Sequence, residues 1–400
     1  MKYVRLKDVA EINAKVLSDS MPDDFSFRYI DIRSVSQGSV SIPADDVTFG
    51  SAPSRARRLA EPGDTVVSTV RTYLRAVAPV PETDEPLVFS TGFAVLHPTC
   101  EVDGRYLSYY CQSAPFVDEV VARSVGVSYP AINPREIGNF RLDLPTLEDQ
   151  RRIADFLDAE TRRIDALVTL GERQAALIAE KRASLIFATV TEGLNGTAQM
   201  TTVDDAWFRF MPEHWSLVAF RHLALRSNAG EVVDKSWWGD GDELLFSCSR
   251  DPVASDFQDF PPEKRTGEND ILLTRNATPY VHLPQRGSIY SNVVQRVTLP
   301  THCNRRWARY SLETASSSIH GYGVSIDTLN YGTWKALPLP VPPSGEQGEI
   351  ARFLDDQVSS VAADIASLRR RGELLQERRQ ALTTAAVTGQ LDVATARGAA

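Results

Sequence analysis

The sequence lacks the features that mark membrane, secreted and metal-binding proteins. It has no run of eighteen apolar residues, and its first residues, MKYVRLKDVAEIN, show no charged stretch followed by an apolar one. Only four cysteines occur in 400 residues, and no two have the C-x-x-C spacing of a zinc site or redox motif. We therefore expect a cytoplasmic protein with no membrane contact, no metal site and cysteines that are buried thiols.

Recognisable catalytic motifs are also missing. The chain has no Gly-Lys pair and hence no phosphate-binding loop, and neither H-E-x-x-H nor G-x-S-x-G occurs. No lysine lies two residues after an acidic residue, and the Asn/Asp-Pro-Pro-aromatic tetrapeptide of amino-methyltransferases is absent. We therefore expect no catalytic residue and no cofactor in this chain. Because scattered catalytic residues escape motif searches, an enzyme stays the first rival hypothesis.

The sequence also lacks an excess of basic residues. Lys+Arg total 43 against 52 Asp+Glu, which gives a net charge of -9. Proteins that bind nucleic acid usually carry a basic excess. However, attraction to phosphates is independent of base sequence, whereas discrimination between sequences needs only a few side chains at base edges. The acidic balance therefore does not exclude a protein that reads DNA.

What the sequence does contain is an internal repeat. Residues 142–194 align without a gap with residues 339–391, and 18 of the 53 pairs are identical. EDQRRIADFLD in the first copy, for example, matches GEQGEIARFLD in the second. A long stretch of unlike sequence precedes each copy. We therefore divide the chain into four segments, 1–143, 144–196, 197–340 and 341–400.

Each copy of the repeat has the pattern of one long helix. Apolar residues recur at alternating steps of four and three over more than four heptads, as in a coiled coil. Two such seams can pair with each other about a pseudo-twofold axis. The predicted helix–helix seam consists of Leu157, Ile164, Val168, Ile178, Leu185, Leu354, Val361, Ile365, Leu375 and Leu382.

The two segments that precede the helices are alike only in plan. Each opens on a strand-like run, YVRLKDVA or WSLVAFRHLA, and each later has a strand followed by a polar loop with arginine. Short β-branched runs between Gly, Pro, Asn and Asp clusters indicate mixed α/β domains. The predicted fold class is α+β, with two mixed α/β domains separated by two long helices that form an antiparallel coiled coil with pseudo-twofold symmetry.

Several phrases of the sequence point to one family. They are PTLEDQRRIADFLD from Pro145, VTEGLNG from Val190, MPEHW from Met211 and AAVTGQLDV from Ala385. Together they resemble the specificity (S) subunits of type I restriction-modification systems. The resemblance covers the whole chain, because an alternation of target-recognition domain and conserved helix is that family's architecture. It implies that segments 1–143 and 197–340 are the target-recognition domains.

The resemblance implies a non-catalytic subunit that binds double-stranded DNA and reads a bipartite target, one half-site per recognition domain. Two methyltransferase subunits would dock on the helices, and restriction or translocase subunits could join them. S-adenosylmethionine and ATP would then belong to those partners. The paired helices would act as a ruler for the gap between the half-sites. Two alternatives stay open: a coiled-coil scaffold or adaptor without DNA recognition, and a specificity subunit that acts only in modification.

The candidate DNA-binding residues are mainly arginines in loops, because arginine binds guanine bidentately and asparagine binds adenine. In the first domain they are Arg71, Tyr73 and Arg75 after a predicted strand, Arg55, Arg57 and Arg58 in SRARR, and Ser128 and Tyr129. In the second domain they are Lys264, Arg265, Arg275, Asn276, Thr278, Arg305, Arg306 and Arg309. The alternative for each of them is a solvated surface side chain.

Overall fold

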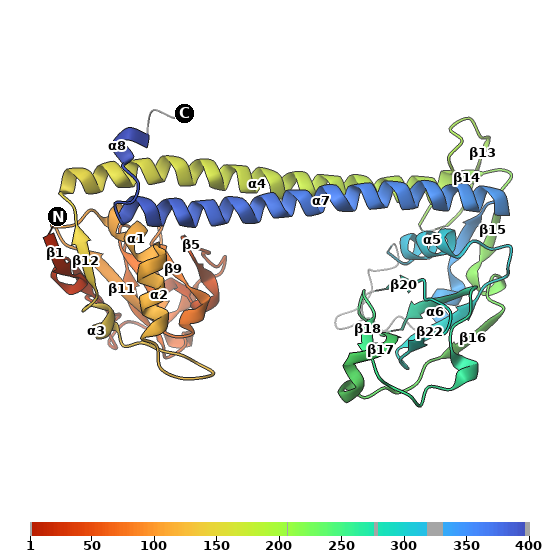
Figure 1. Ribbon diagram of the computed structural model, residues 1–400, viewed down its shortest axis with the longest axis horizontal. Coiled ribbons are helices and arrows are strands. Elements are labelled where there is room, and N and C mark those ends of the chain that lie inside the picture. Colours follow the sequence, from red (N-terminus) through yellow and green to blue (C-terminus); the bar gives the residue numbers. More distant parts are fainter. Residues whose placement is uncertain (1, 206, 276–278, 318–330, 397–400) are drawn as a thin grey trace. The chain divides into compact units, whose positions relative to one another are not determined.

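The computed structural model of the protein describes residues 2–205, 207–275, 279–317 and 331–396. They fall into two compact units, of which unit 1 comprises residues 1–172 and 369–400, and unit 2 comprises residues 173–368. Two long helices, α4 (Leu147–Glu192) and α7 (Ser344–Val387), each contribute one part to either unit (Figure 1).

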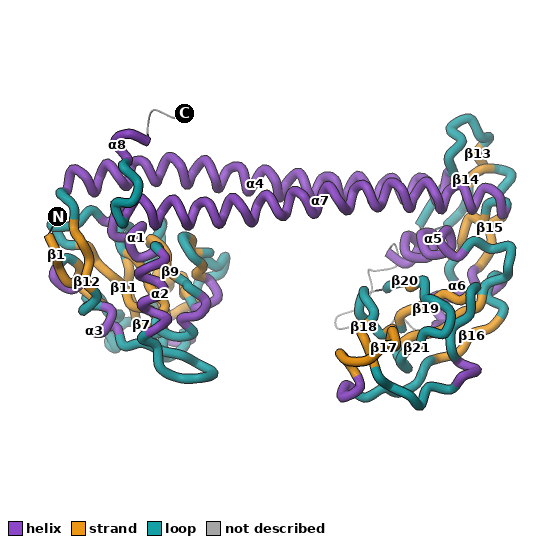
Figure 2. The backbone as a smooth tube through the Cα atoms, viewed as in Figure 1, coloured by secondary structure: helices purple, strands orange, loops and turns teal. Residues whose placement is uncertain are grey.

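The globular part of unit 1 is built of short strands covered by helices (Figure 2). The strands are β1 (Lys2–Arg5), β2 (Ala10–Ile12), β3 (Ser26–Ile30), β4 (Val35–Ser36), β5 (Ser39–Val40), β6 (Val47–Thr48), β7 (Ala56–Ala60), β8 (Thr65–Ser68), β9 (Val77–Pro79), β10 (Leu87–Ser90), β11 (Phe93–Pro98) and β12 (Arg141–Leu144). The helices are α1 (Gly104–Gln112), α2 (Ala114–Ala122), α3 (Pro134–Ile137) and, near the end of the chain, α8 (Val393–Ala396). The two four-stranded sheets have the orders β6-β3-β10-β7 and β2-β11-β8-β9.

Apolar runs occupy the inner strands of these sheets. β8 reads TVVS and β10 reads LVFS, and every residue of both is buried. Runs of this kind suit strands that are covered on both faces, because no side chain then faces water. The main core of the unit also includes Ala154 and Leu157 of α4 and Val387 of α7. The parts of the long helices that belong to unit 1 are therefore packed into its core.

Unit 2 repeats this construction. Its strands are β13 (Met200–Thr202), β14 (Phe210–Pro212), β15 (Ser216–Ala219), β16 (Arg226–Ala229), β17 (Trp238–Phe246), β18 (Val253–Ser255), β19 (Asp270–Thr274), β20 (Val281–His282), β21 (Ile289–Tyr290), β22 (Val294–Thr298) and β23 (Pro338–Val341). Its remaining helices are α5 (Arg305–Ser317) and α6 (Tyr331–Ala336). The larger sheets have the orders β16-β22-β19-β20 and β18-β17-β21.

The two globular parts share one topology although their sequences differ. The antiparallel sheet β2-β11-β8-β9 of unit 1 corresponds to β16-β22-β19-β20 of unit 2. In the second sheet β10 runs parallel to β3, as β21 runs parallel to β17. The pair β1–β12 likewise has its counterpart in β15–β23. This confirms the predicted fold class of two mixed α/β domains on a common plan.

The long helices bury the predicted seam. In α4 between residues 164 and 182, every position of the four-three pattern is at least partly buried and every residue between them is exposed, and α7 shows the same alternation between residues 358 and 379. Unit 1 contains the beginning of α4 and the end of α7, where Arg379 Nε lies 3.4 Å from Asp165 Oδ1. Unit 2 contains the opposite ends, so the helices run antiparallel, as predicted. No helix among the described residues is long and apolar enough to cross a membrane.

At the start of each helix the seam residue packs against a globular part. Leu157 lies in the core of unit 1 and Leu354 in that of unit 2, and both are 0% exposed. The heptad pattern therefore identified their burial, but it did not reveal that sheets and short helices cover them. The reason is that periodicity reports which face is buried and not what buries it.

The burial of Leu157 predicts a large loss of stability on truncation. Leu157→Ala should lower the free energy of unfolding by about 2 to 5 kcal/mol, because it leaves a cavity in the core of unit 1. Scanning calorimetry should show this as a lower Tm. Leu170 on the same helix is 61% exposed, so Leu170→Ala is the matched control and should change stability by no more than about 0.5 kcal/mol. Equal effects of the two substitutions would contradict the packing described here.

Candidate nucleic-acid interface

Two loops of unit 1 are joined into one surface, called here the two-loop surface and consisting of residues 69–75 and 124–131. The first loop follows β8, and the second follows α2. The N–H of Arg71 donates to the carbonyl of Pro130 at 2.8 Å, and the Thr72 hydroxyl donates to Ser124 Oγ at 2.7 Å. An isolated bridge between Val70 and Ala131 adds to these bonds. The two loops are therefore held as one body.

Arg71 and Tyr129 form the centre of this surface. Arg71 has a left-handed backbone with a φ of 51°, which is uncommon for a residue with a side chain. Its guanidinium carbon lies 5.0 Å from the centroid of the Tyr129 ring, and Tyr129 is 67% exposed. Among the described residues no carboxylate pairs with Arg71. Its charge is thus free for an external ligand, and the predicted residues Tyr73 and Ser128 lie exposed in the same two loops.

Arg75 ends the same loop but has a partner within the unit. It too is left-handed, with a φ of 54°, and its guanidinium lies 2.6 Å from the carboxylate of Asp118 on α2. Arg71 and Arg75 thus share a loop and a backbone conformation, but of the two only Arg75 is paired with a carboxylate among the described residues.

Of the three arginines in SRARR, one is exposed beside the two-loop surface and two pack within unit 1. The side chain of Arg55 is exposed, and its carbonyl accepts a hydrogen bond from the N–H of Thr91 at 2.8 Å. The next residue, Gly92, accepts a hydrogen bond at its carbonyl from the N–H of Thr69, which belongs to the two-loop surface. Arg55 therefore adjoins the two-loop surface. Arg57 lies over the Phe49 ring, with its guanidinium carbon 5.3 Å from the centroid, and burial lowers the pKa of Arg58. These last two side chains pack within the unit.

In unit 2 most of the described candidates are engaged internally. Asn276 and Thr278 lie outside the described residues. Lys264 pairs with the carboxylate of Glu231, and Arg265 lies 2.9 Å from that of Glu243. Arg275 donates its N–H to the carbonyl of Val293, as Thr69 does to Gly92 in unit 1, and its guanidinium donates to the carbonyl of Asn292 at 3.2 Å. Arg275 therefore occupies the position of Thr69 in the shared topology.

The arginines at the beginning of α5 also have partners within the unit. Arg305 donates to the carbonyls of Asp270 and Pro284, both at 3.1 Å, and burial lowers its pKa. Arg306 and Arg309 lie 2.8 and 3.7 Å from carboxylate oxygens of Asp355 on α7. These three arginines are therefore bonded within unit 2 and do not belong to the candidate interface.

The structure adds two arginines that no sequence motif indicated. Arg33 follows β3 and Arg250 follows β17, which is the equivalent strand of unit 2, and both are exposed. Ile32, next to Arg33, approaches Gly92, and Cys248 Sγ near Arg250 lies 3.9 Å from the carbonyl of Val293. Both arginines thus lie at the sheet end that carries Thr69 or Arg275. Only the shared topology could have found them, because the surrounding sequences are unlike.

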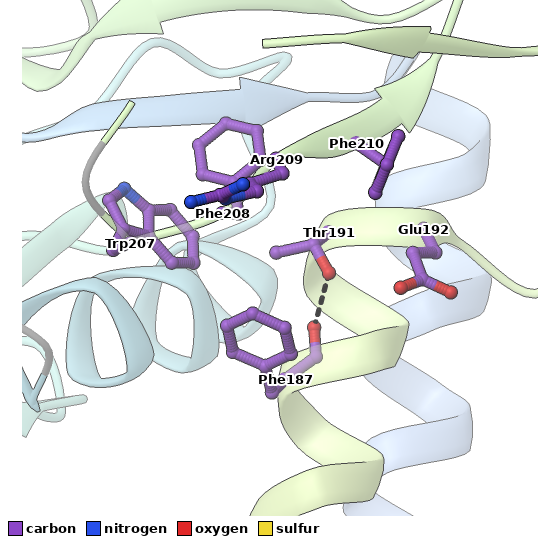
Figure 3. A pocket seen from close by; sticks show the side chains of 7 residues that line it. All are labelled: Phe187, Thr191, Glu192, Trp207, Phe208, Arg209 and Phe210. Carbon is purple, nitrogen blue, oxygen red and sulfur yellow. Dashed lines mark hydrogen bonds between the residues drawn. The ribbon is translucent and has the colours of Figure 1, made fainter. Parts of the chain in front are cut away.

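The described residues offer no cluster of side chains suited to a metal ion, since they contain no group of three or more His, Cys, Asp or Glu side chains that could hold one. Cys111 and Cys303 are buried as expected, whereas the expectation was wrong for Cys100, which is exposed, and for Cys248, which is half-buried. A pocket of about 300 Å³ lies in unit 2 between the end of α4 and residues 207–210. Figure 3 shows the side chains that line it. It is lined by Phe187, Thr191, Glu192, Trp207, Phe208, Arg209 and Phe210.

The walls of this pocket are mainly aromatic. The Thr191 hydroxyl donates to the carbonyl of Phe187 at 2.8 Å, so it is engaged within the helix (Figure 3). Glu192 and Arg209 are the charged side chains of the lining. A pair of a nucleophile and a general base, which hydrolytic or transfer chemistry would need, is absent from these seven residues.

Comparisons with known proteins agree with this architecture. A family model described as "Type I restriction modification DNA specificity domain" matches residues 1–174 and 237–365. A chain from a structure described as "Structural basis underlying complex assembly and conformational transition of the type I R-M system" is similar in fold, with a TM-score of 0.74, 22% identity and 98% of both chains covered. The HsdS subunit from Thermoanaerobacter tengcongensis gives a TM-score of 0.50 and 22% identity, over 98% of this chain and 97% of that one. No curated protein matches.

Proposed function

The chain belongs to the type I restriction-modification DNA specificity family, and on this premise we propose that it selects the DNA target of a methyltransferase complex. Each globular part would read one half-site of a bipartite sequence in double-stranded DNA. In unit 1 the reading surface would be the two-loop surface with Arg55 and Arg33, and in unit 2 it would include Arg250 and Arg275.

One observation carries this proposal. The two globular parts have the same topology, and each packs on the start of one of two long helices whose sequences repeat each other. Their exposed loops nevertheless differ in sequence. A scaffold would need no such divergence, whereas a reader of two unlike half-sites would. The acidic net charge fits a protein that contributes base contacts and leaves phosphate attraction to partner subunits.

The division of labour follows from the same premise. We infer that this chain catalyses no reaction. Two methyltransferase subunits would dock on the repeated helices and bring S-adenosylmethionine, and restriction or translocase subunits, where they are present, would bring ATP. The complex would act in the cytoplasm, where the DNA is.

Reconstitution tests this division. The complex of this chain with its methyltransferase subunits should transfer labelled methyl groups from S-adenosylmethionine to adenine within one bipartite sequence. The chain alone should transfer none, and the methyltransferase subunits alone should show no such sequence preference. Methyl transfer by the purified chain alone would support the rival enzyme hypothesis. Assembly without any sequence preference would support the scaffold hypothesis.

A further inference from the structure

A buried glutamine lies at the same place in each unit, between the long helix and the first helix after the sheets. Gln150 Oε1 accepts a hydrogen bond from the N–H of Asp103, and Gln347 Oε1 accepts one from the N–H of Asn304, both at 2.8 Å. Asp103 and Asn304 in turn cap the first turns of α1 and α5 with their own side chains. Gln150 is 1% and Gln347 is 3% exposed. Each glutamine thus ties the start of a short helix to a long one.

An aspartate two turns further along each long helix repeats the arrangement. Asp158 Oδ1 accepts a hydrogen bond from the Tyr109 hydroxyl, and Asp355 Oδ1 accepts one from the Tyr310 hydroxyl, both at 2.8 Å. Burial raises the pKa of both tyrosines to about 12. At neutral pH both hydroxyls therefore keep the proton that they donate to the aspartate.

The other oxygen of each aspartate binds an arginine. Arg105 lies 2.6 Å from Asp158 Oδ2, and Arg306 lies 2.8 Å from Asp355 Oδ2. α1 and α5 therefore both present Arg-x-x-x-Tyr to an aspartate. The aspartates lie in the repeated part of the sequence, but the Arg-x-x-x-Tyr pairs lie in the globular parts, which are otherwise unlike.

The apolar contacts at the same place are of a different kind. Ala154 and Leu157 in unit 1, and Ala351 and Leu354 in unit 2, are fully buried against the globular parts. Burial of apolar surface holds two bodies together but has little directional preference. Hydrogen bonds to ionised groups are both directional and strong. The polar contacts are therefore the ones that can fix an angle.

From this repetition we infer that Asp158 and Asp355, supported by Gln150 and Gln347, are positioning residues that set the direction in which each globular part leaves its helix. This direction would decide which spacer between two half-sites the protein accepts. The inference rests on the proposed function, because a spacer exists only if both globular parts read DNA. It differs from the ruler hypothesis, since it concerns an angle at each helix rather than helix length.

Two conservative substitutions test it. Tyr109→Phe and Tyr310→Phe each remove only a hydroxyl that donates to an aspartate and keep the ring. The Tyr109 hydroxyl also lies 3.1 Å from Thr161 Oγ1 of α4, so Tyr310→Phe is the simpler of the two tests. The complex with the methyltransferase subunits is titrated with DNA duplexes that carry its bipartite motif with the native spacer, or with one base pair more or fewer. For either variant, discrimination between the native and altered spacers should fall on the order of tenfold, the factor carried by one hydrogen bond to a charged group. The preferred bases of the half-sites should not change.

Asp158→Asn is the stronger variant and removes the charge that binds both Tyr109 and Arg105. If the Asp158→Asn variant does not fold, the spacer preference of the Tyr→Phe variants tests the inference. The control is Glu373→Gln, which breaks an exposed pair with Arg370 on α7, where both side chains are more than 60% exposed. It should leave spacer discrimination unchanged. Folded Tyr→Phe variants with the wild-type spacer preference would overturn the inference. A wild-type complex that reads no bipartite sequence would instead overturn the proposed function, and this inference with it.

Discussion

Replacing Arg71 with asparagine should weaken binding to the half-site read by unit 1 by roughly tenfold to a hundredfold, and the preference at one base of that half-site should relax. The reason is that the half-exposed Arg71 has no carboxylate partner among the described residues, and its guanidinium lies over the exposed ring of Tyr129. The other half-site should be read as before. Competition binding with duplexes varied at each position of the motif would measure both effects.

Asparagine is chosen because it tolerates the left-handed backbone of Arg71. The matched control is Arg75→Asn, in the same loop and with the same backbone conformation. Because Arg75 is paired with Asp118 at 2.6 Å, its loss should change the base preference little. Equal losses for the two variants, or an unchanged motif with Arg71→Asn, would contradict the role given to the two-loop surface.

Inserting four residues after Gly171 and four after Leu368 should change the spacer of the recognised sequence and leave both half-sites unchanged. The two positions are equivalent in the repeat, so the seam can keep its pairing in both helices. Four residues lengthen a helix by about 6 Å, which is close to two base-pair steps of about 3.4 Å each. A side chain at Gly171 would meet no neighbour, so the site tolerates change. Mapping methylated adenines in cells that express the variant would report the new spacer.

A single insertion in α4 provides the comparison. It displaces the seam of α4 against that of α7 by about 6 Å and rotates it by about 40°. We expect this variant to lose stability and activity, unlike the double insertion. If the double insertion changed the half-sites while the spacer stayed the same, the ruler hypothesis would be wrong.

The sequence predicted the helices well because their pattern is one-dimensional. The four-three steps depend only on the helical period, and the buried positions of α4 between residues 164 and 182 and of α7 between residues 358 and 379 follow them. The fold class followed from the repeat and from the strand-like runs. By contrast, no local pattern showed that Leu157 and Leu354 pack against sheets, because that depends on residues distant in the chain.

The candidate site was predicted less completely. Loop position suggested Arg71 and Tyr129, but it could not tell Arg71 from Arg75, since only the fold brings Asp118 beside Arg75. The arginine-rich stretch at Arg305 to Arg309 reads as a basic surface in the sequence. In the structure it binds Asp355 and backbone carbonyls, because α5 packs on α7. Charge in a sequence does not say which charges are already neutralised within the fold.

The most direct test is a map of methylated adenines across the genome of the host strain, with and without this gene. The proposed function predicts that deletion removes one methylated motif, made of two unlike half-sites separated by a fixed gap of unspecified bases. Restoring the gene should restore the same motif. An identical methylation map with and without the gene, in cells that produce the methyltransferase subunits, would contradict the proposed role of this chain in target selection.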